Sequence, residues 1–422
     1  MWESLLKLFR IPDLKKRVIF TLLMLVIFRV GAHVPVPGID PQALANVFSR
    51  GGLLSFLDMF AGGALSRFSI LALGIMPYIN ASIIFQLLTS VVPKLEELAK
   101  SGEEGRDKIA QYTRWGTILL ATVQGFGITV WLESMGVVFT PGIPYRITVI
   151  LTLTAGSMFL MWLGELVSDY GIGNGISLII FAGIVARIIP QMVSTVALIR
   201  VGEINPIMFI LNLVFWVLII AFVVLFQEAQ RRIPVQYAKR VVGRRMYGGQ
   251  STHIPIRIIQ GGVIPIIFAS SILLFPATLA QFFQGSAFMK SISDALTPNS
   301  PLYLTIYAAL IIFFTFFYTA VTFNPMELAD NMKKYGGFIP GIRPGRPTVE
   351  YLDRSLSRIT LWGALFLMVV AVLPDLLVRV TNVTTLYFGG TGIIIMVGVA
   401  IETVRQLEAQ LLMRHYEGFI KK

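Results

Sequence analysis

Polar but uncharged side chains inside apolar stretches are the residues of this sequence best suited to a chemical role. Amide and hydroxyl groups at membrane depth hydrogen-bond between helices, and each such contact contributes about 0.6–2 kcal/mol. The pattern fits ordinary helix packing and a polar seam along a movable helix interface equally well. The candidate residues are Asn80, Ser82, Gln86, Thr122, Gln124, Ser270, Ser271 and Thr278.

Sequence patterns of covalent or metal-dependent chemistry are absent. The sequence contains no Walker A, HExxH or GxSxG pattern, and "GIGNG" at 171–175 indicates a tight turn between two apolar stretches. It has no cysteine, and its three histidines are far apart, which disfavours a metal site. We therefore expect neither an enzyme nor a bound cofactor or metal.

Isoleucines recur at four-residue spacing in two apolar stretches. Ile75, Ile79 and Ile83 share one helical face, as do Ile176 and Ile180. Such rows usually face lipid or a protein core. If they converge on a pore, they can form a hydrophobic constriction that gates by excluding water.

Ten apolar stretches must position these residues. Only 14% of the residues are charged, against about 25% in soluble domains. A membrane helix needs roughly 20 apolar residues, so the pattern predicts an all-α integral membrane protein. The predicted spans are 18–34, 70–92, 115–132, 147–167, 176–200, 206–226, 263–283, 302–323, 359–378 and 387–403.

The distribution of lysine and arginine orients these spans. Most of the 35 basic residues lie in the two terminal tails and in alternate loops. Because basic loops stay on the cytoplasmic side, we expect both termini to be cytoplasmic. The two longest cytoplasmic loops, 227–262 and 324–358, are basic and rich in Gly and Pro. They are either simple anchors or a docking surface for a large acidic or polyanionic partner.

Ionisable residues within the spans are few. Arg29 and Glu165 lie near span ends, where each can reach an interface. The sequence shows no mid-membrane row of Asp or Glu of the kind that a proton or sodium relay requires. This weakens the alternative of an ion-coupled secondary transporter. A non-transporting assembly scaffold is a second alternative.

Long segments along almost the whole chain resemble, in the same order, the bacterial SecY family, the channel subunits of the Sec translocon. The segments are "LDMFAGGALSR", "LGIMPYINASIIFQLL", "GIGNGIS", "RRIPVQYAKR", "QSTHIPIR", "GVIPIIFASSILLFPAT", "FNPMELADNMKK", "GFIPGIRPG" and "LYFGGT". The resemblance implies ten helices in two pseudo-symmetric halves, 1–200 (spans 1–5) and 201–422 (spans 6–10), around a central hourglass pore.

The resemblance also implies three elements of that pore. A short half-helix in the segment at about 56–70, with Phe60, Gly62, Gly63 and Arg67, would be the plug. A lateral gate would open between spans 2 and 3 on one side and 7 and 8 on the other. Six of the polar residues above would line it: Asn80, Gln86, Thr122, Gln124, Ser271 and Thr278. A ring at the waist of the pore would consist of Ile75, Ile79, Ile176, Ile180, Ile267 and Ile395.

By the same resemblance, the channel passes unfolded preproteins across the bacterial inner (plasma) membrane and releases hydrophobic segments sideways into the lipid bilayer. The implied partners are the SecE and SecG subunits, the motor ATPase SecA, the ribosome and the signal sequences of preproteins. The basic loops would dock SecA and the ribosome through Arg231, Arg232, Lys239, Arg240, Arg244, Arg245, Lys333, Lys334, Arg343 and Arg346.

Overall fold

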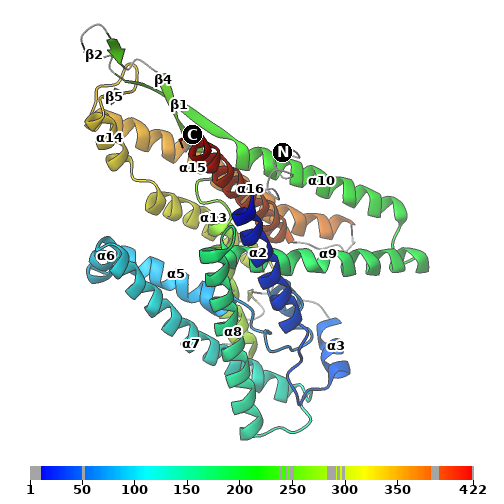
Figure 1. The fold of residues 1–422 in the computed structure, drawn as a ribbon. Helices are drawn as coiled ribbons and strands as arrows, with labels where there is room; N and C mark the ends of the chain where they lie inside the picture. The colour runs from blue at the N-terminus through cyan, green and yellow to red at the C-terminus, as the bar shows by residue number, and fades with distance from the viewer. Residues whose placement is uncertain are drawn as a thin grey trace.

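Ten long helices form the body of the protein in a computed structural model (Figure 1). The structure describes residues 11–49, 53–237, 240–242, 245–247, 251–282, 291, 295–296, 300–381 and 389–420. Each helix overlaps one predicted apolar stretch, which confirms the ten-helix membrane architecture. The helices are α2 (Pro12–Gly31), α5 (Met76–Val91), α7 (Glu103–Ser134), α8 (Ile143–Tyr170), α9 (Gly175–Val201), α10 (Pro206–Glu228), α11 (Ile264–Phe282), α13 (Pro301–Thr322), α15 (Arg346–Thr381) and α16 (Gly389–Ile420).

Seven helices in the described part of the chain are long and apolar enough to cross a membrane on their own. An eighth crossing is possible if α5 and α6 (Pro93–Lys100), which are bent by 100° at their junction, count as one span. The apolar part of α11 is shorter, and α2 carries Lys15, Lys16 and Arg17 in its first turns. The predicted span 70–92 is helical only from Met76, because turns occupy the residues before it.

Helices that follow one another in the chain pack as neighbours. The first half contains the contacts of α5 with α7, α7 with α8 and α8 with α9. The second half contains those of α11 with α13, α13 with α15 and α15 with α16. Contacts of α11 with α5 and α7, and of α16 with α9, connect these two groups. The boundary between the halves at residue 200 stays a prediction.

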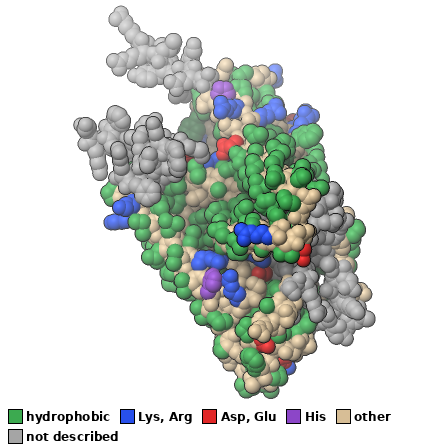
Figure 2. Space-filling model, turned by 90° about the vertical axis from the view of Figure 1, so that its right-hand side faces the viewer, with side chains coloured by type: hydrophobic (Ala, Val, Ile, Leu, Met, Phe, Trp, Pro, Cys, Tyr) green, Lys and Arg blue, Asp and Glu red, His purple; other side chains and the backbone are tan. Residues whose placement is uncertain are grey.

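The outer faces of the bundle are apolar, as contact with lipid requires. On α10, Ile207, Leu211 and Leu218 are exposed. Figure 2 shows hydrophobic side chains over much of one face of the molecule. In water, an exposed apolar surface of this extent would drive association, whereas in a bilayer it is solvated by lipid tails.

The two long basic loops fold together into one small unit at one end of the molecule (Figure 1). Its sheet has the order β4-β1-β5, formed by β4 (Ser251–Arg257), β1 (Gln230–Tyr237) and β5 (Gly337–Phe338). A second, two-stranded sheet consists of β2 (Arg240–Val242) and β3 (Arg245–Tyr247). The sheet order joins residues from both loops, a connection that the sequence pattern did not predict.

A separate apolar core holds this unit together. Ile233 and Val235 alternate with exposed residues along β1 and pack against α14 (Pro325–Lys334) and α15. A proline at position 234 disfavours a central strand. However, β5 pairs only with Gln236 and Tyr237, beyond the proline. Pro234 therefore has no strand partner on the β5 side, where its missing N–H would matter. Because a proline normally argues against a strand, β1 is not evident in the sequence.

Candidate functional site

Residues 53–75, between α3 (Pro41–Ser49) and α5, fold into the centre of the molecule. Helix α4 (Leu53–Phe60) begins before the predicted plug range and ends within it. Gly62 and Gly63 follow in the left-handed region, with φ of +67° and +84°, a conformation that ends helices. Of the predicted plug residues, Phe60 is therefore helical, whereas Gly62, Gly63 and Arg67 lie in turns. We refer to residues 53–75 as the central segment.

Charged side chains hold the central segment in place. The Asp58 carboxylate is 2% exposed and lies 3.3 Å from Arg187 Nη1 on α9. Arg29 on α2 donates a hydrogen bond of 2.8 Å to the carbonyl of Gly62. Arg67, by contrast, is exposed, and its Nη1 lies 2.9 Å from Nε2 of His33. Charged groups at this depth are stable only when protein or water satisfies them, and most of these are satisfied by protein.

Glycine contacts bring the central segment close to its neighbours. A β-carbon added at Gly62 would lie 2.8 Å from Cα of Gly183 on α9, closer than carbon atoms approach. A β-carbon at Gly392 on α16 would lie 3.4 Å from the sulfur of Met59. The central segment thus rests directly on the backbone of α9 and beside α16, and larger residues at these glycines would separate them.

The isoleucines of the predicted ring come from four helices or their caps. Five of them are buried in the main apolar core, whereas Ile176 is half-buried. A β-carbon at Gly164 on α8 would lie 2.9 Å from Cγ1 of Ile176, so that side chain packs toward α8. The ring itself stays a prediction. The buried members are Ile75, Ile79, Ile180, Ile267 and Ile395.

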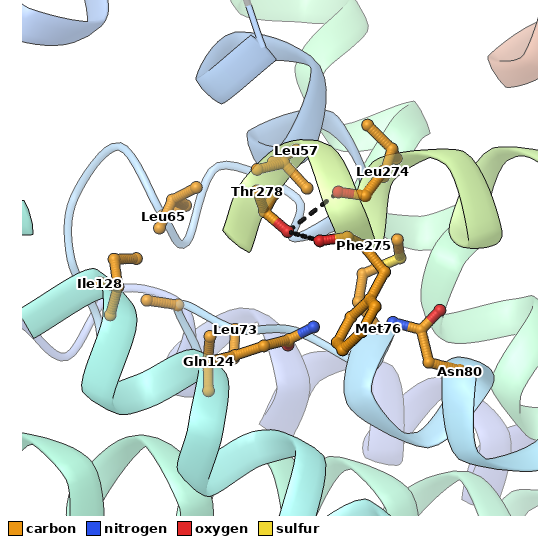
Figure 3. Close-up of a pocket in the computed structure, with 11 residues that line it drawn as sticks. Leu57, Leu65, Leu73, Met76, Asn80, Gln124, Ile128, Leu274, Phe275 and Thr278 are labelled. Carbon is orange, nitrogen blue, oxygen red and sulfur yellow. Dashed lines mark hydrogen bonds between the residues drawn. The ribbon is translucent and has the colours of Figure 1, made fainter. Parts of the chain in front are cut away.

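A pocket of about 40 Å³ lies where α5, α7 and α11 meet the central segment (Figure 3). Asn80 of α5, Gln124 of α7 and Thr278 of α11 line it, so three of the six predicted gate residues converge there. Leu57 and Leu65 of the central segment close one side. Thr278 Oγ1 lies 2.9 Å from the carbonyl of Leu274 and 2.8 Å from that of Phe275 and donates within its own helix.

The interface around this pocket has unsatisfied polar groups. Asn80 is 5% exposed, and its Oδ1 has no hydrogen-bond partner in the described part of the chain. The same holds for Oγ of the fully buried Ser271 on α11. Leaving such a group unsatisfied costs about 1–3 kcal/mol, so separating these helices loses less than separating a fully bonded interface.

Two predicted gate residues lie elsewhere. Thr122 is exposed, and its Oγ1 donates a hydrogen bond of 2.8 Å to the carbonyl of Ile118 in α7. It is two residues from Gln124, which places the two side chains on opposite sides of the helix. Gln86 is also exposed, near the end of α5. The structure does not bring these two residues to the pocket.

The predicted docking residues gather on the β unit where the structure describes them. The side chains of Arg231, Arg232, Lys333, Lys334 and Arg343 are exposed. Arg346 is also exposed and lies 3.6 Å from Glu350, one turn further along α15. Arg240 and Arg245 belong to β2 and β3, whereas Lys239 and Arg244 lie outside the described residues.

A second cavity, of about 110 Å³, lies at the base of the β unit between α10, α13 and α16. Burial, and after it the neighbouring Arg405, lower the pKa of Arg257, while Glu228 and Glu402 act in the opposite direction. Arg405 donates to Glu228 at 2.7 Å. Arg257, Arg405 and Glu402 line this cavity, and Glu228 offsets part of the remaining positive charge through its ion pair with Arg405.

Sequence reasoning missed the ion pair between Asp58 and Arg187. Their positions are far apart in the chain, and the only local signal is a charge within an apolar stretch, which calls for a partner. Glu165, which the sequence placed near a span end, pairs with Arg114 of α7 at 2.9 Å. Among the described residues, no group of three His, Cys, Asp or Glu side chains could hold a metal ion.

Comparison with known proteins identifies the family. The protein translocase subunit SecY of Thermus thermophilus is 49% identical over 429 residues, covering 100% of this chain and 97% of the relative. The subunit of Escherichia coli K12 is 48% identical over 419 residues, covering 97% and 94%.

Solved structures share the fold. One, described as the structure of a protein conducting channel, has a TM-score of 0.67 at 20% identity, covering 94% of this chain and 92% of that one. Another, Sec61 in the canine ribosome-channel complex from the endoplasmic reticulum, has a TM-score of 0.63 at 19% identity, with the same coverage. The SecY family model matches residues 69–404. The chain therefore belongs to the SecY family.

Proposed function

We propose that this chain is the protein-conducting channel of a bacterial translocon. It passes unfolded preproteins across the membrane and releases hydrophobic segments into the bilayer. Relatives over the full length are named protein translocase subunits, which argues against an ion-coupled transporter and against an enzyme. The observation that carries the proposal is the pocket between α5, α7 and α11, which has polar residues on its walls and is closed by the central segment.

The interface of α5 and α7 with α11 is the lateral gate in this proposal. A signal sequence binds there when the helices separate, and opening is favoured because Oδ1 of Asn80 and Oγ of Ser271 have no hydrogen bond to lose. The segment then leaves for lipid or continues through the pore according to its composition. Each leucine favours lipid by about 0.5 kcal/mol, and each aspartate opposes it by about 3 kcal/mol, at the centre of the bilayer.

The central segment and the isoleucine ring form the seal. A translocating chain presents every type of side chain, and polar ring residues would bind some of them strongly. Branched apolar side chains adhere weakly and exclude water when the pore is narrow. Ile75 is the last residue of the central segment and the N-cap of α5, and Ile79 lies in the first turn of α5, so movement of the central segment is coupled to the ring.

The β unit is the docking surface for the ribosome and for SecA, and the SecE and SecG subunits complete the complex. A solved relative is described as a ribosome-channel complex, which supports a ribosomal partner. Since the sequence contains no nucleotide-binding motif, the driving energy comes from the partner.

The membrane is the bacterial inner membrane, and both chain termini face the cytoplasm, as the basic loops indicate.

Reconstitution in vesicles with SecA and a purified precursor tests this function. We expect ATP-dependent protection of the precursor from added protease, since only a channel moves it into the vesicle lumen. Vesicles lacking the chain serve as the control. Saturable uptake of a small solute without precursor protection would favour the transporter, and neither activity would favour a scaffold.

Reversing the charge of Arg343 is expected to impair docking. The side chain is exposed on the β unit, while its carbonyl accepts a hydrogen bond of 2.9 Å from Thr348 that the change leaves intact. Arg343→Glu should therefore lower SecA-driven translocation by about tenfold, with unchanged thermal stability. Arg200 is exposed in the last turn of α9, outside the β unit, so Arg200→Glu is the matched control. Equal rates for both variants would contradict the docking role.

A further inference from the structure

The carboxylate of Asp58 has two distinct sets of partners. Its Oδ1 accepts hydrogen bonds from the backbone N–H groups of Leu65 and Ser66, at 3.0 and 2.9 Å. These bonds shape the turns that follow α4. Its Oδ2 faces Nη1 of Arg187 at 3.3 Å, and this contact reaches another element, α9. One buried side chain therefore folds the central segment and also attaches it to the bundle.

The ion pair and the glycine contact match in spacing. Asp58 and Gly62 are four residues apart in the central segment, and Gly183 and Arg187 are four residues apart on α9. On α9, residues at this spacing share one helical face, whereas Gly62 lies in the turn just after the end of α4. Asp58 meets Arg187 and Gly62 meets Gly183, so the two elements contact each other at two points in antiparallel order. The glycine pair provides the close approach, and the ion pair provides attraction across it.

We propose that Asp58 and Arg187 are a positioning pair that holds the central segment against α9 in the closed channel, and that their separation is part of channel opening. The inference rests on the proposed function of the central segment as the seal.

The environment of the pair determines the expected effects. Asp58 is 2% exposed, whereas the side chain of Arg187 is 28% exposed. Removing the arginine leaves a carboxylate buried without its cation, and this charge favours movement of the segment toward water. Removing the charge of Asp58 leaves an arginine that water can still reach. Loss of Arg187 should therefore displace the segment more than neutralisation of Asp58.

The absence of cysteine allows a direct test of this displacement. The chain contains no cysteine, and Ala64 of the central segment is fully buried, so Ala64→Cys introduces a single protected thiol. A membrane-impermeant maleimide is added to the solution outside vesicles that contain the full channel complex. The rate of thiol labelling reports the position of the segment, and ion leak across the same vesicles reports the seal.

In this background, Arg187→Gln is expected to raise the labelling rate at least about tenfold and to increase the leak. Arg187→Lys should restore slow labelling, because the cation returns. Asp58→Asn should have a smaller effect, since its amide oxygen still accepts from Leu65 and Ser66. The double variant Asp58→Asn with Arg187→Gln should label more slowly than Arg187→Gln alone, because no buried charge remains.

Arg114→Gln is the matched control, because it breaks the ion pair with Glu165 at 2.9 Å, which joins α7 to α8. It should leave labelling unchanged. Slow labelling of Arg187→Gln, or equal labelling of the single and double variants, would overturn the positioning role. Fast labelling of Arg187→Gln without ion leak would support that role and contradict the seal function of the central segment.

Discussion

Replacing Ile75, Ile79, Ile180 and Ile267 together by glycine is expected to raise the resting ion conductance of the channel at least about tenfold. The four side chains are between 1% and 5% exposed and come from α9, α11 and the start of α5. Their removal would leave space for a continuous file of water, and ions cross a hydrophobic constriction only when it is wet. Single-channel recording in planar bilayers measures the change.

Glycine also weakens helices, by about 1 kcal/mol per substitution, so a control must carry the same number of changes. Ile147, Ile189, Ile207 and Ile210 are exposed on the outside of the bundle. Glycine at these four positions should leave the conductance unchanged. An unchanged leak in the first variant, or the same leak in both, would argue against the ring.

The substitution Gly183→Val on α9 is expected to displace the central segment and to cause a persistent ion leak. Even the first atom of a side chain there would lie 3.1 Å from Cα of Gly62, and valine adds two further methyl groups. Overpacking of this kind costs about 1–3 kcal/mol when the neighbour cannot move. The neighbour here is backbone, held by Arg29 and Asp58, so we expect the whole segment to shift. Leak across vesicles and the midpoint of thermal unfolding measure the effect.

Alanine allows a matched comparison within this prediction. In a helix, Gly→Ala stabilises by about 1 kcal/mol where there is room for a β-carbon. Gly125 on α7 has such room, since its nearest contact would be Cα of Ile150 at 3.6 Å. Gly125→Ala should therefore raise stability, and Gly183→Ala should fail to do so. Equal stabilisation by both would show that the seat on α9 tolerates a side chain.

Polar residues of the gate illustrate how far sequence reasoning extends. Asn80, Gln124 and Thr278 were predicted from their type and from the family resemblance, and the structure brings them to one pocket. Gln86 and Thr122 have the same chemistry and belong to the same helices, yet they are exposed. Polarity is visible in the sequence, but the face that a residue occupies depends on how its helix is rotated against its neighbours. The functional role of all six residues stays a prediction.

The basic loops show a similar limit. Their charge and their position between spans were readable, because both are local properties. Their fold was not, since β1 contains a proline and β5 has only two residues. The strands form because partners from distant parts of the chain supply the sheet and its core.

By itself, the sequence determined the class, the ten membrane helices and the expected orientation of this protein. The length of an apolar stretch and the basic residues beside it determine whether and in which direction that stretch crosses the bilayer, largely independently of the other stretches. Only the tertiary structure decided which polar residues meet at the pocket, that two loops share one sheet, and that Asp58 pairs with Arg187. Each of these depends on contacts between residues far apart in the chain, and such contacts are fixed by packing of the whole bundle rather than by local composition.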